Sequence, residues 1–218
     1  MNSLYGGGGF GKTPPVVKNL LIINVLLLFA NYVFQGIDLI KILGIYYPAS
    51  DHFSPYQFIT HMFVHAGFAH LFFNMFALWM FGRVLESVWG NERFLFYFLF
   101  TGIGASLLHI FVQWLQISSI ENPMIVQQLQ NIPTVGASGA VFGILLAFGM
   151  LFPNAQLMLL FPPIPIKAKY FVIGYGVIEL FLGISQPGSS VAHFAHVGGM
   201  LFGLILIKYW DSKGKRFG

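Results

Sequence analysis

Apolar segments separated by shorter polar stretches account for most of this 218-residue chain. Six apolar segments can be recognised, at about residues 18–37, 61–82, 93–115, 135–152, 170–185 and 191–210. A helix that crosses a lipid bilayer needs about 20 mainly apolar residues, and the fifth segment, which contains glycines, is the shortest of the six. The pattern therefore predicts an all-α membrane protein with six transmembrane helices.

The polar stretches predict how the chain is divided. Residues 1–16 are polar and Gly-rich and predict a flexible cytoplasmic tail, residues 17–210 a six-helix domain, and residues 211–218 a short basic cytoplasmic tail. The N-terminal stretch lacks a short apolar core followed by a small-residue cleavage site. We therefore expect the first apolar segment to be retained as a span.

Two of the connections between apolar segments differ in what they predict. Residues 116–134 are predicted to form the longest clearly polar loop. The connection after the fourth segment contains Pro162, Pro163 and Pro165. Because proline removes a helical hydrogen bond and clashes with the preceding turn, this connection is predicted to be non-helical.

Composition supports a membrane protein and excludes several kinds of chemistry. Hydrophobic residues make up 56% of the chain and charged residues 8%, whereas soluble domains carry about 25% charged residues. The chain contains no cysteine, so disulfides, thiolate catalysis and Cys-ligated metals are excluded. The basic residues behind the net charge of +4 are scattered along the chain, so we expect a lipid bilayer and no nucleic acid as a partner.

The distribution of Lys and Arg predicts the orientation of the spans. With the N-terminal side of the first span in the cytoplasm, ten of the eleven basic residues fall on the cytoplasmic side and only Lys41 falls outside. The ten are Lys12, Lys18, Arg83, Arg93, Lys167, Lys169, Lys208, Lys213, Lys215 and Arg216. Cytoplasmic loops are enriched in Lys and Arg, so both termini are predicted to be cytoplasmic. The second, fourth and sixth spans then run from the outer to the inner face.

Polar residues at the start of these three spans share one predicted layer near the outer face. His70 lies early in the second span, Ser138 opens the fourth, and His196 lies early in the sixth. Asn74 follows His70 at i+4 and therefore shares its helix face. The Ser138 amide lies near a helix N-terminus, where unpaired N–H groups favour a developing negative charge. A hydroxyl, a base and such donors are what acyl transfer requires.

Small residues indicate that the fourth and sixth helices approach each other closely. Gly136, Gly139 and neighbouring alanines remove bulk around Ser138, and Gly199 and Gly203 form a Gly-x-x-x-Gly spacing after His196. This spacing is typical of packed membrane helices. We therefore expect a close helix contact that brings the imidazole over the hydroxyl.

Taken together, these residues resemble the motifs of a known family. The motifs are His70-x-x-x-Asn74, Gly136-Ala137-Ser138-Gly139 and Ala195-His196-Val197-Gly198-Gly199-x-x-x-Gly203. They resemble those of the rhomboid intramembrane serine proteases, and the resemblance extends over about residues 55–209. It implies a six-helix bundle of the bacterial type, in the inner (cytoplasmic) membrane, with a buried active site that opens to the outer side.

The resemblance also implies a role for each residue. Ser138 would be the nucleophile and His196 the general base, in a dyad without a third, acidic member. His70, Asn74 and the Ser138 amide would stabilise the oxyanion, and no metal or cofactor would take part. The substrates would be transmembrane segments of other proteins. Phe142 stands where many family members carry a Tyr that stacks on the catalytic His, so we expect its ring to pack in the same way.

Other ionisable residues within the spans leave alternatives open. His193, one turn before His196, competes for the role of base, although we expect it at the outer rim. Glu179 lies within the fifth span, where a carboxylate is a functional candidate or a protonated or hydrogen-bonded structural group. No partner can be named for His109, toward the outer end of the third span.

Clustered polar residues elsewhere have a simpler interpretation. His61, His65 and His70 are close in sequence and suggest metal ligands, but no nearby intramembrane carboxylate or His-Glu-x-x-His motif accompanies them. A metal site is therefore not predicted. Arg83 and Glu86, three residues apart at the inner face, are interpreted as structural.

Two other classes of function compete with the protease. A protease-inactive relative would bind transmembrane helices as a chaperone or trafficking factor, but such a relative usually lacks the Ser or the His. A small transporter or channel would carry charged residues along a continuous path, whereas here the polar set is confined to one outer layer. The oligomeric state is left open.

Overall fold

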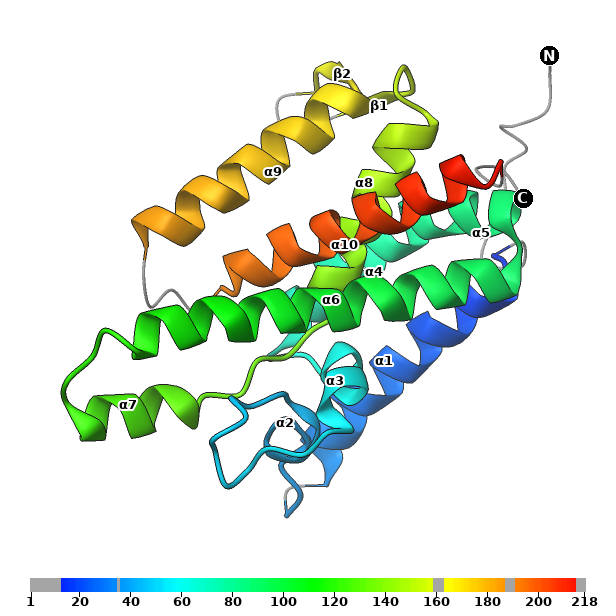
Figure 1. Cartoon of the computed structure of the whole chain (residues 1–218). Coiled ribbons are helices and arrows are strands. Elements are labelled where there is room, and N and C mark those ends of the chain that lie inside the picture. The colour runs from blue at the N-terminus through cyan, green and yellow to red at the C-terminus, as the bar shows by residue number, and fades with distance from the viewer. Residues whose placement is uncertain (1–12, 35, 159–162, 187–190, 215–218) are drawn as a thin grey trace.

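The computed structural model describes residues 13–34, 36–158, 163–186 and 191–214 and is mainly helical (Figure 1). Long helical segments occupy the six predicted apolar regions. They are α1 (Pro15–Val33), the continuous run of α4 (Phe68–Ala77), the π-helical turn η3 (Leu78–Gly82) and α5 (Arg83–Trp89), then α6 (Asn91–Ile117), α8 (Ser138–Leu151), α9 (Ala168–Ser185) and α10 (His193–Ser212). The prediction of a helical membrane bundle is confirmed.

Four stretches of the described chain are helices that are long and apolar enough to cross a membrane. They are Pro15–Val33, Phe68–Trp89, Asn91–Ile117 and Ala168–Ser185. α8 is apolar but has only 14 residues. α10 has 20 residues, but it begins with two histidines in its first turn and ends near Lys208 and Asp211. Six spans therefore require that the short α8 and the more polar α10 also cross.

The second helical run is displaced from its predicted position. α4 begins at Phe68 rather than at residue 61, and the run ends at Trp89, beyond the predicted residue 82. Residues 61–67 form the 3-10 helix η2 (His61–Phe63) and a connection that leads to Gly67. Hydropathy alone does not separate a buried connection from the helix that follows it, because both are apolar.

Short helices occur where polar connections were predicted. α2 (Leu39–Leu43) and α3 (Gln57–Thr60) lie between the first two long helices, and α7 (Pro123–Gln130) follows α6. Asn122 caps α7, because its side chain accepts a hydrogen bond from the Met124 N–H at 3.0 Å. An Asn N-cap followed by Pro at the first helical position is a sequence signal for a helix start, and the loop prediction overlooked it.

The connection between α8 and α9 contains a short hairpin. β1 (Gln156–Met158) pairs antiparallel with β2 (Pro165–Lys167), so the all-α prediction is wrong for these residues. Three-residue strands are too short to show the alternation that predicts a strand. Pro163 and Pro165 lie outside helices as predicted, and Pro162 is not among the described residues.

The predicted tails lie mostly outside the described part of the chain, which begins at residue 13 and ends at residue 214. α1 begins at Pro15, slightly before the predicted domain start at residue 17. α10 continues to Ser212, slightly past the predicted domain end at residue 210.

α6, α8 and α10 pack against one another at the centre of the bundle (Figure 1). Gly199 of α10 lies directly on the backbone of Gly139 in α8, so a Cβ at position 199 would overlap the Gly139 carbonyl. Gly203 faces the Tyr97 hydroxyl, which donates a hydrogen bond to the Gly143 carbonyl at 2.8 Å. The small residues therefore allow two helix backbones to touch, as they do in other membrane proteins.

One end of the bundle gathers the start of α1 and the end of α10 (Figure 1). Glu86 of α5 is 2% exposed, and its two carboxylate oxygens accept hydrogen bonds from the Val16 and Val17 amides at 2.8 and 2.7 Å. A carboxylate at a helix N-terminus satisfies amides that have no partner within the helix. Glu86 therefore joins α1 to the bundle, which agrees with its structural interpretation.

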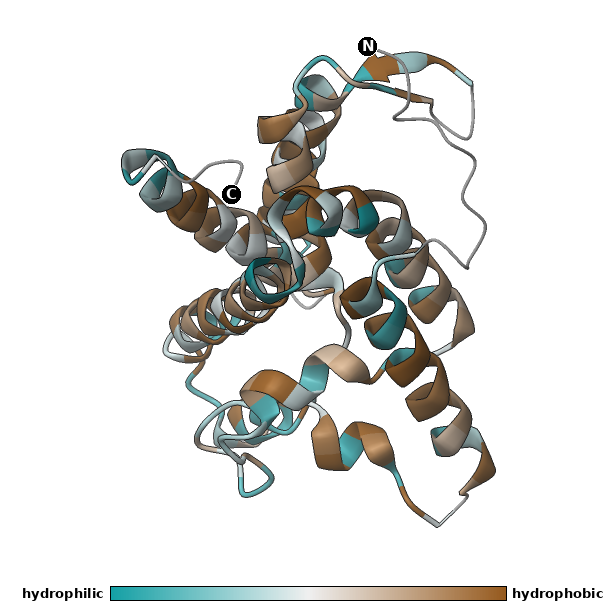
Figure 2. Ribbon diagram, turned by 90° about the vertical axis from the view of Figure 1, so that its right-hand side faces the viewer, coloured by the Kyte–Doolittle hydropathy of each residue, from teal (hydrophilic) through white to brown (hydrophobic). Residues whose placement is uncertain are grey.

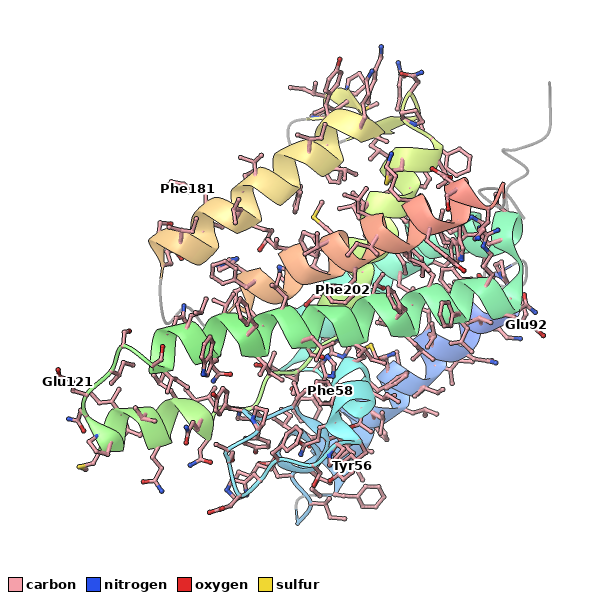
Figure 3. All side chains as sticks on the ribbon, in the orientation of Figure 1. Tyr56, Phe58, Glu92, Glu121, Phe181 and Phe202 are labelled. Atoms are coloured by element: carbon pink, nitrogen blue, oxygen red, sulfur yellow. The ribbon has the colours of Figure 1, made fainter. Side chains whose placement is uncertain are left out.

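Polar residues gather at the ends of the bundle and in its connections, whereas the helices are mainly apolar (Figure 2). Figure 3 shows Glu92 and Glu121 near opposite ends of α6. Phe181 projects from α9 away from the bundle, and Phe202 of α10 points toward α6, where it packs on Gly104. The pattern is that of spanning helices, which keep charge near their ends.

Candidate active site

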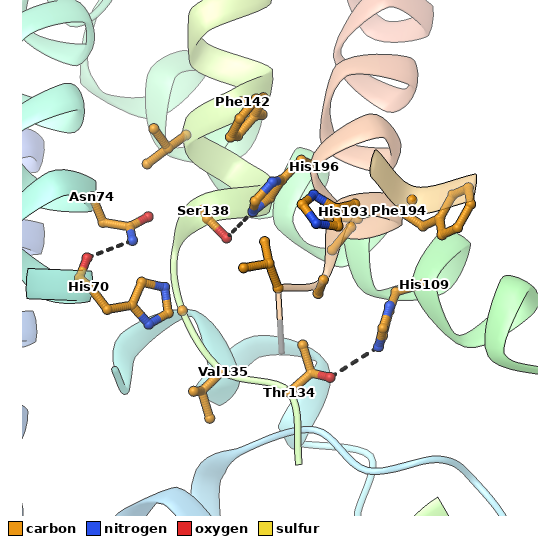
Figure 4. A pocket seen from close by; sticks show the side chains of 18 of the residues that line it. His70, Asn74, His109, Thr134, Val135, Ser138, Phe142, His193, Phe194 and His196 are labelled. Atoms are coloured by element: carbon orange, nitrogen blue, oxygen red, sulfur yellow. Dashed lines mark hydrogen bonds between the residues drawn. The ribbon is translucent and has the colours of Figure 1, made fainter. Parts of the chain in front are cut away.

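Ser138 and His196 lie within hydrogen-bonding distance of each other, although 58 positions separate them in the sequence. Ser138 is the first residue of α8, and His196 lies in the first turn of α10. The Ser138 Oγ is 2.8 Å from the His196 Nε2 (Figure 4). The contact between Gly139 and Gly199 holds the two helices close enough for this. His196 is thus the candidate base that contacts the hydroxyl, while the Nδ1 of His193 contacts a carboxylate described below.

The imidazole of His196 is held by a second aromatic ring. Phe142, one turn after Ser138 in α8, stacks on it with ring centres 4.2 Å apart and 6° between the ring planes. Phe142 also packs against Tyr175 of α9, with ring centres 6.0 Å apart. A stacked, buried ring cannot rotate freely, so this contact helps to set the direction in which the imidazole nitrogens point.

His70 and Asn74 lie on the other side of Ser138 from His196 (Figure 4). The Asn74 Nδ2 donates to the His70 carbonyl at 2.8 Å, and its buried Oδ1 has no hydrogen-bond partner among the described residues. The His70 Nδ1 accepts a hydrogen bond from the Ala66 amide at 3.4 Å, so the proton of the neutral ring lies on Nε2. An imidazole N–H and a carboxamide therefore flank the first turn of α8, whose amides lack partners within the helix.

The chain enters α8 directly over the His70 ring. Gly136 has φ +116°, a conformation that residues with side chains rarely adopt. A Cβ on Gly136 would also lie 2.6 Å from Cε1 and 2.7 Å from Nε2 of His70. Both constraints require glycine, so Gly136 lets the backbone pass close to a ring nitrogen that can donate a hydrogen bond.

Two histidines that precede the span Phe68–Trp89 anchor the backbone just before α8. The Gly136 N–H donates to the His61 carbonyl at 2.8 Å, and the Ala137 N–H donates to the His65 Nε2 at 3.4 Å. The His61 Nδ1–H donates to the Gln57 carbonyl at 2.8 Å. Burial lowers the pKa of His61 to about 4, so its ring is neutral at physiological pH. Both histidines thus have a structural role.

Residue 134, in the same approach to α8, is held from two sides. The backbone of Thr134 pairs with that of Ile45, with N···O distances of 2.9 and 2.8 Å. The Thr134 Oγ1 lies 3.0 Å from the His109 Nε2 of α6. His109, for which no partner could be named from the sequence, therefore helps to hold the segment that leads to the site.

A buried carboxylate lies behind His196. The Glu179 Oε2 is 2.8 Å from the His196 Nδ1 and 2.7 Å from the His193 Nδ1. The expected dyad has no acidic member, whereas here a carboxylate contacts the imidazole. His193, for which a position at the outer rim was expected, has a buried side chain. A signal was present in the sequence, because Gly176, Glu179 and Gly183 are spaced to share one face of an otherwise apolar helix. The distance between this face and His196 depends on packing, so the spacing alone could not assign the contact.

The predicted site residues line a cavity of about 1190 Å³. His70, Asn74, Ser138 and His196 form one polar part of its wall. Apolar and aromatic side chains of α4, η3, α8 and α9 continue the wall, among them Phe76, Met80, Leu145, Phe171 and Tyr175. The cavity is larger than most ligand pockets, which measure about 300–1,000 Å³, and leaves room for a polypeptide segment and water beside the hydroxyl.

Comparison with known proteins assigns the chain to a family. The family model described as Rhomboid domain matches residues 52–210. Rhomboid-like protein 11, chloroplastic, of Arabidopsis thaliana is 32% identical over 203 residues, which are 86% of this chain and 62% of the relative. Rhomboid protease AarA of Providencia stuartii is 31% identical over 157 residues (68% of this chain, 53% of the relative). Rhomboid protease GluP of Bacillus subtilis is 30% identical over 152 residues, which are 68% of this chain and 24% of the relative. This chain belongs to the rhomboid family.

The family and the apolar helices together define a multi-pass protein embedded in a membrane. The chain spans less than two thirds of the length of these relatives, from 62% down to 24%. The names of relatives refer to chloroplasts and to mitochondria, and other relatives come from bacteria. The comparisons therefore do not single out the predicted bacterial inner membrane.

Proposed function

We propose that this chain is an intramembrane serine endopeptidase that hydrolyses peptide bonds in or near transmembrane segments of other membrane proteins. The observation that carries the proposal is the 2.8 Å separation of the Ser138 Oγ and the His196 Nε2, beside His70 and Asn74. A hydroxyl in contact with an imidazole is the arrangement of an activated nucleophile. The relatives named rhomboid protease support the same class of reaction.

In the proposed reaction, the Ser138 hydroxyl transfers its proton to the His196 Nε2 as Oγ attacks the carbonyl carbon of the scissile bond. The resulting oxyanion is stabilised by the His70 Nε2–H, the Asn74 carboxamide and the first amides of α8. His196 then donates the proton to the leaving amine as the C–N bond breaks, and an acyl-enzyme remains. Water, deprotonated by the same imidazole, attacks the ester, releases a carboxylate and restores Ser138.

The length of α8 supports a site below the membrane surface. Its 14 residues rise about 21 Å at 1.5 Å per residue, against about 30 Å for the hydrocarbon core of a bilayer. With the end of α8 at the cytoplasmic surface, Ser138 would lie roughly 9 Å below the outer edge of that core. Hydrolysis at that depth requires a path for water, and the cavity beside Ser138 supports one.

We also propose that the chain crosses a bacterial inner membrane six times. The start of α1 and the end of α10 would both lie on the cytoplasmic side. Ten of the eleven basic residues would lie on that side. Because the chain has no cysteine, single-Cys variants report orientation cleanly. A membrane-impermeant maleimide should label Ser119→Cys in intact spheroplasts and Ser212→Cys only after permeabilisation. The reverse pattern would contradict the orientation.

Purified protein in liposomes tests the activity. It should cleave a transmembrane substrate whose helix is destabilised near one end and carries small residues at the cleavage position. Ser138→Ala and His196→Ala should each abolish cleavage while the protein stays folded. A fluorophosphonate should label the wild type and leave Ser138→Ala unlabelled, and labelling that persists in this variant would place the nucleophile elsewhere. Activity lost in His193→Ala but kept in His196→Ala would reassign the base.

The competing function is binding of transmembrane helices without protease activity. We retain it as an alternative because one relative is named rhomboid-like rather than rhomboid protease. This function predicts capture of a transmembrane helix without cleavage and without labelling of Ser138. Loss of cleavage in EDTA would point instead to a metal-dependent reaction. Cleavage that resists EDTA and depends on Ser138 excludes both.

A further inference from the structure

The carboxylate of Glu179 connects the proposed base to a second histidine. Its Oε2 is 2.8 Å from the His196 Nδ1 and 2.7 Å from the His193 Nδ1, and all three side chains are buried. A carboxylate inside a membrane helix is costly unless its oxygens are paired. Two imidazole N–H groups provide that pairing, so the three side chains form one unit that reaches Ser138 through His196.

We propose that Glu179 is a positioning residue for catalysis, so that the site is a Ser138–His196–Glu179 triad supported by His193 rather than a Ser–His dyad. The inference rests on the proposed protease function and deepens it. In a Ser-His-Asp triad the acidic member orients the imidazole and stabilises the imidazolium without taking the proton itself. Glu179 has the position that this role requires.

The hydrogen bonds select one tautomer of His196. An ionised carboxylate only accepts hydrogen bonds, so the His196 Nδ1 carries a proton directed at Glu179. The Nε2 of the neutral ring is then unprotonated and accepts from the Ser138 hydroxyl at 2.8 Å. When Oγ attacks, that proton moves to Nε2, and the ring becomes a cation whose Nδ1 is 2.8 Å from a carboxylate oxygen. The attraction is strongest in the charged transition state, which is the condition for a rate effect.

α9 brings Glu179 to this position through two glycines on the same face. Gly183 lies on Phe194 of α10, where a Cβ would be 3.0 Å from the ring, and a Cβ on Gly176 would be 3.1 Å from Met200. Of the buried residues of α9, only Glu179 is ionisable. The helix thus presents a single carboxylate to α10 at the level of the base.

The same three side chains have the ligand types of a metal site, since their ligand atoms lie within 4.8 Å of one another. Their separations favour hydrogen bonds instead. Zinc held at about 2.0–2.1 Å by a tetrahedral set of ligands places those ligand atoms about 3.3 Å from one another. The nitrogen–oxygen separations here are 2.7 and 2.8 Å, which are the lengths of charge-assisted N–H···O bonds.

In the proposed triad, His193 supports the carboxylate. Its Nδ1–H donates to the same Oε2 that receives the His196 Nδ1–H. The second donor stabilises the ionised form of Glu179 and restricts its rotation. Removal of His193 should therefore weaken the triad without removing its charge, and its effect on kcat should be smaller than that of removing the charge of Glu179.

Glu179→Gln in the complete protein, reconstituted in liposomes, tests the triad with kcat and KM measured on one transmembrane substrate. The amide has almost the same shape but cannot stabilise an imidazolium. We expect kcat to fall about 10²- to 10⁴-fold, as in Ser-His-Asp enzymes that lose the charge of the acid, with KM nearly unchanged. Glu179→Asp, which keeps the charge, should recover part of the loss.

Glu86→Gln is the matched control, because it makes the same chemical change at another buried carboxylate that accepts two N–H bonds. It should lower the thermal unfolding midpoint and leave kcat per folded molecule unchanged. The triad would be overturned if Glu179→Gln had the kcat of the wild type. It would also be overturned if both Glu179→Gln and Glu86→Gln lost activity only in proportion to the loss of folded protein. If Glu179→Gln does not fold, His193→Ala tests the triad in its place. We expect kcat of this variant to fall about tenfold, because one hydrogen bond to the carboxylate is lost. An unchanged kcat would overturn the proposal.

Ser138→Ala separates the two proposals. Cleavage that persists in this variant would refute the serine protease function itself, and the triad with it. Cleavage that is lost in Ser138→Ala but has full kcat in Glu179→Gln would refute the triad and leave the protease function standing. The triad is supported if cleavage is lost in Ser138→Ala and kcat falls in Glu179→Gln, while Glu86→Gln stays active.

Discussion

Glu86 and Glu179 are buried carboxylates, 2% and 8% exposed, and each accepts two N–H hydrogen bonds of 2.7–2.8 Å. The donors to Glu86 are the backbone amides of Val16 and Val17, whereas the donors to Glu179 are imidazoles. A backbone amide keeps its single proton, but an imidazole can take a second proton and become a cation. The same pairing therefore fastens a helix at Glu86 and, in the proposed triad, controls a base at Glu179.

The helix that carries Ser138 and the helix that carries Glu179 also differ in how deeply they are buried. Ten of the fourteen residues of α8, at the centre of the bundle, are buried, but only four of the eighteen residues of α9 are. α9 lies along one side of the bundle (Figure 1) and exposes large apolar side chains. Elements with few buried contacts open at a lower free-energy cost than the core. The proposed nucleophile and base thus lie on helices of the packed centre, while the proposed acidic residue lies on a helix with few buried residues.

The largest expected effect comes from combining Glu179→Gln with His196→Ala. Loss of the base alone should lower kcat roughly 10⁴- to 10⁶-fold, and loss of the carboxylate behind it should then cost nothing more, because residues of a catalytic unit are not additive. Measurement of kcat/KM for both single variants and the double variant checks this. Additive losses would mean that Glu179 does not act through His196.

Gly199→Val should have the next largest effect, by disturbing the packed core. A Cβ at position 199 would overlap the Gly139 carbonyl, so α10 must move away from α8 and carry His196 with it. A displacement of about 1 Å at a catalytic group can cost about 10²-fold in rate, so kcat should fall by at least that factor. Gly174→Val is the matched control, because no atom lies within 4 Å of a Cβ there. Equal activity of the two variants would contradict the role of the glycine contact.

Glu86→Gln should affect stability rather than chemistry. The variant weakens two charge-assisted hydrogen bonds to the start of α1, each worth about 1.5–3 kcal/mol. For a chain of this size, each kcal/mol corresponds to about 2–4 °C in the midpoint of thermal unfolding, so the midpoint should fall by several degrees. Thermal unfolding in detergent measures this. An unchanged midpoint would show that the contact of Glu86 with the start of α1 does not contribute to stability.

Changes at Phe142 should have the smallest effects. Phe142→Tyr keeps the ring that stacks on His196 at 4.2 Å, so kcat should stay within about threefold of the wild type. Phe142→Leu removes an aromatic contact worth about 0.5–1.5 kcal/mol and should lower kcat roughly 2- to 10-fold. Steady-state kinetics on one substrate compare the two. Full activity of Phe142→Leu would mean that stacking does not orient the base.

Much of the helical fold could be predicted because a membrane helix must satisfy its backbone hydrogen bonds within one apolar segment. The segments were correct to within several residues, and the largest error was at α4, which begins at Phe68. α7 and the hairpin of β1 and β2 were missed. In α7 an N-cap signal was overlooked, and in the hairpin the strands are too short for periodicity.

The sequence by itself determined which groups are available for chemistry. Ser138, His70, Asn74 and His196 stand near the starts of apolar segments that run in the same direction, so one predicted layer already contained them. Small residues at Gly139 and Gly199 indicated a close approach of two helices. These inferences follow from hydropathy, charge bias and helical spacing, which are local properties of a chain in a bilayer.

Only the tertiary structure decided which side chain contacts the far nitrogen of His196. His196 as the base and a packing contact from Phe142 were already expected from the sequence and the resemblance, and the structure gives both contacts. The position of Glu179 behind His196 depends on the rotation and separation of packed helices. Periodicity places a residue on one face of its own helix but says nothing about which neighbour that face meets. For Glu179, packing of α9 on α10 decided whether the carboxylate meets lipid or a histidine.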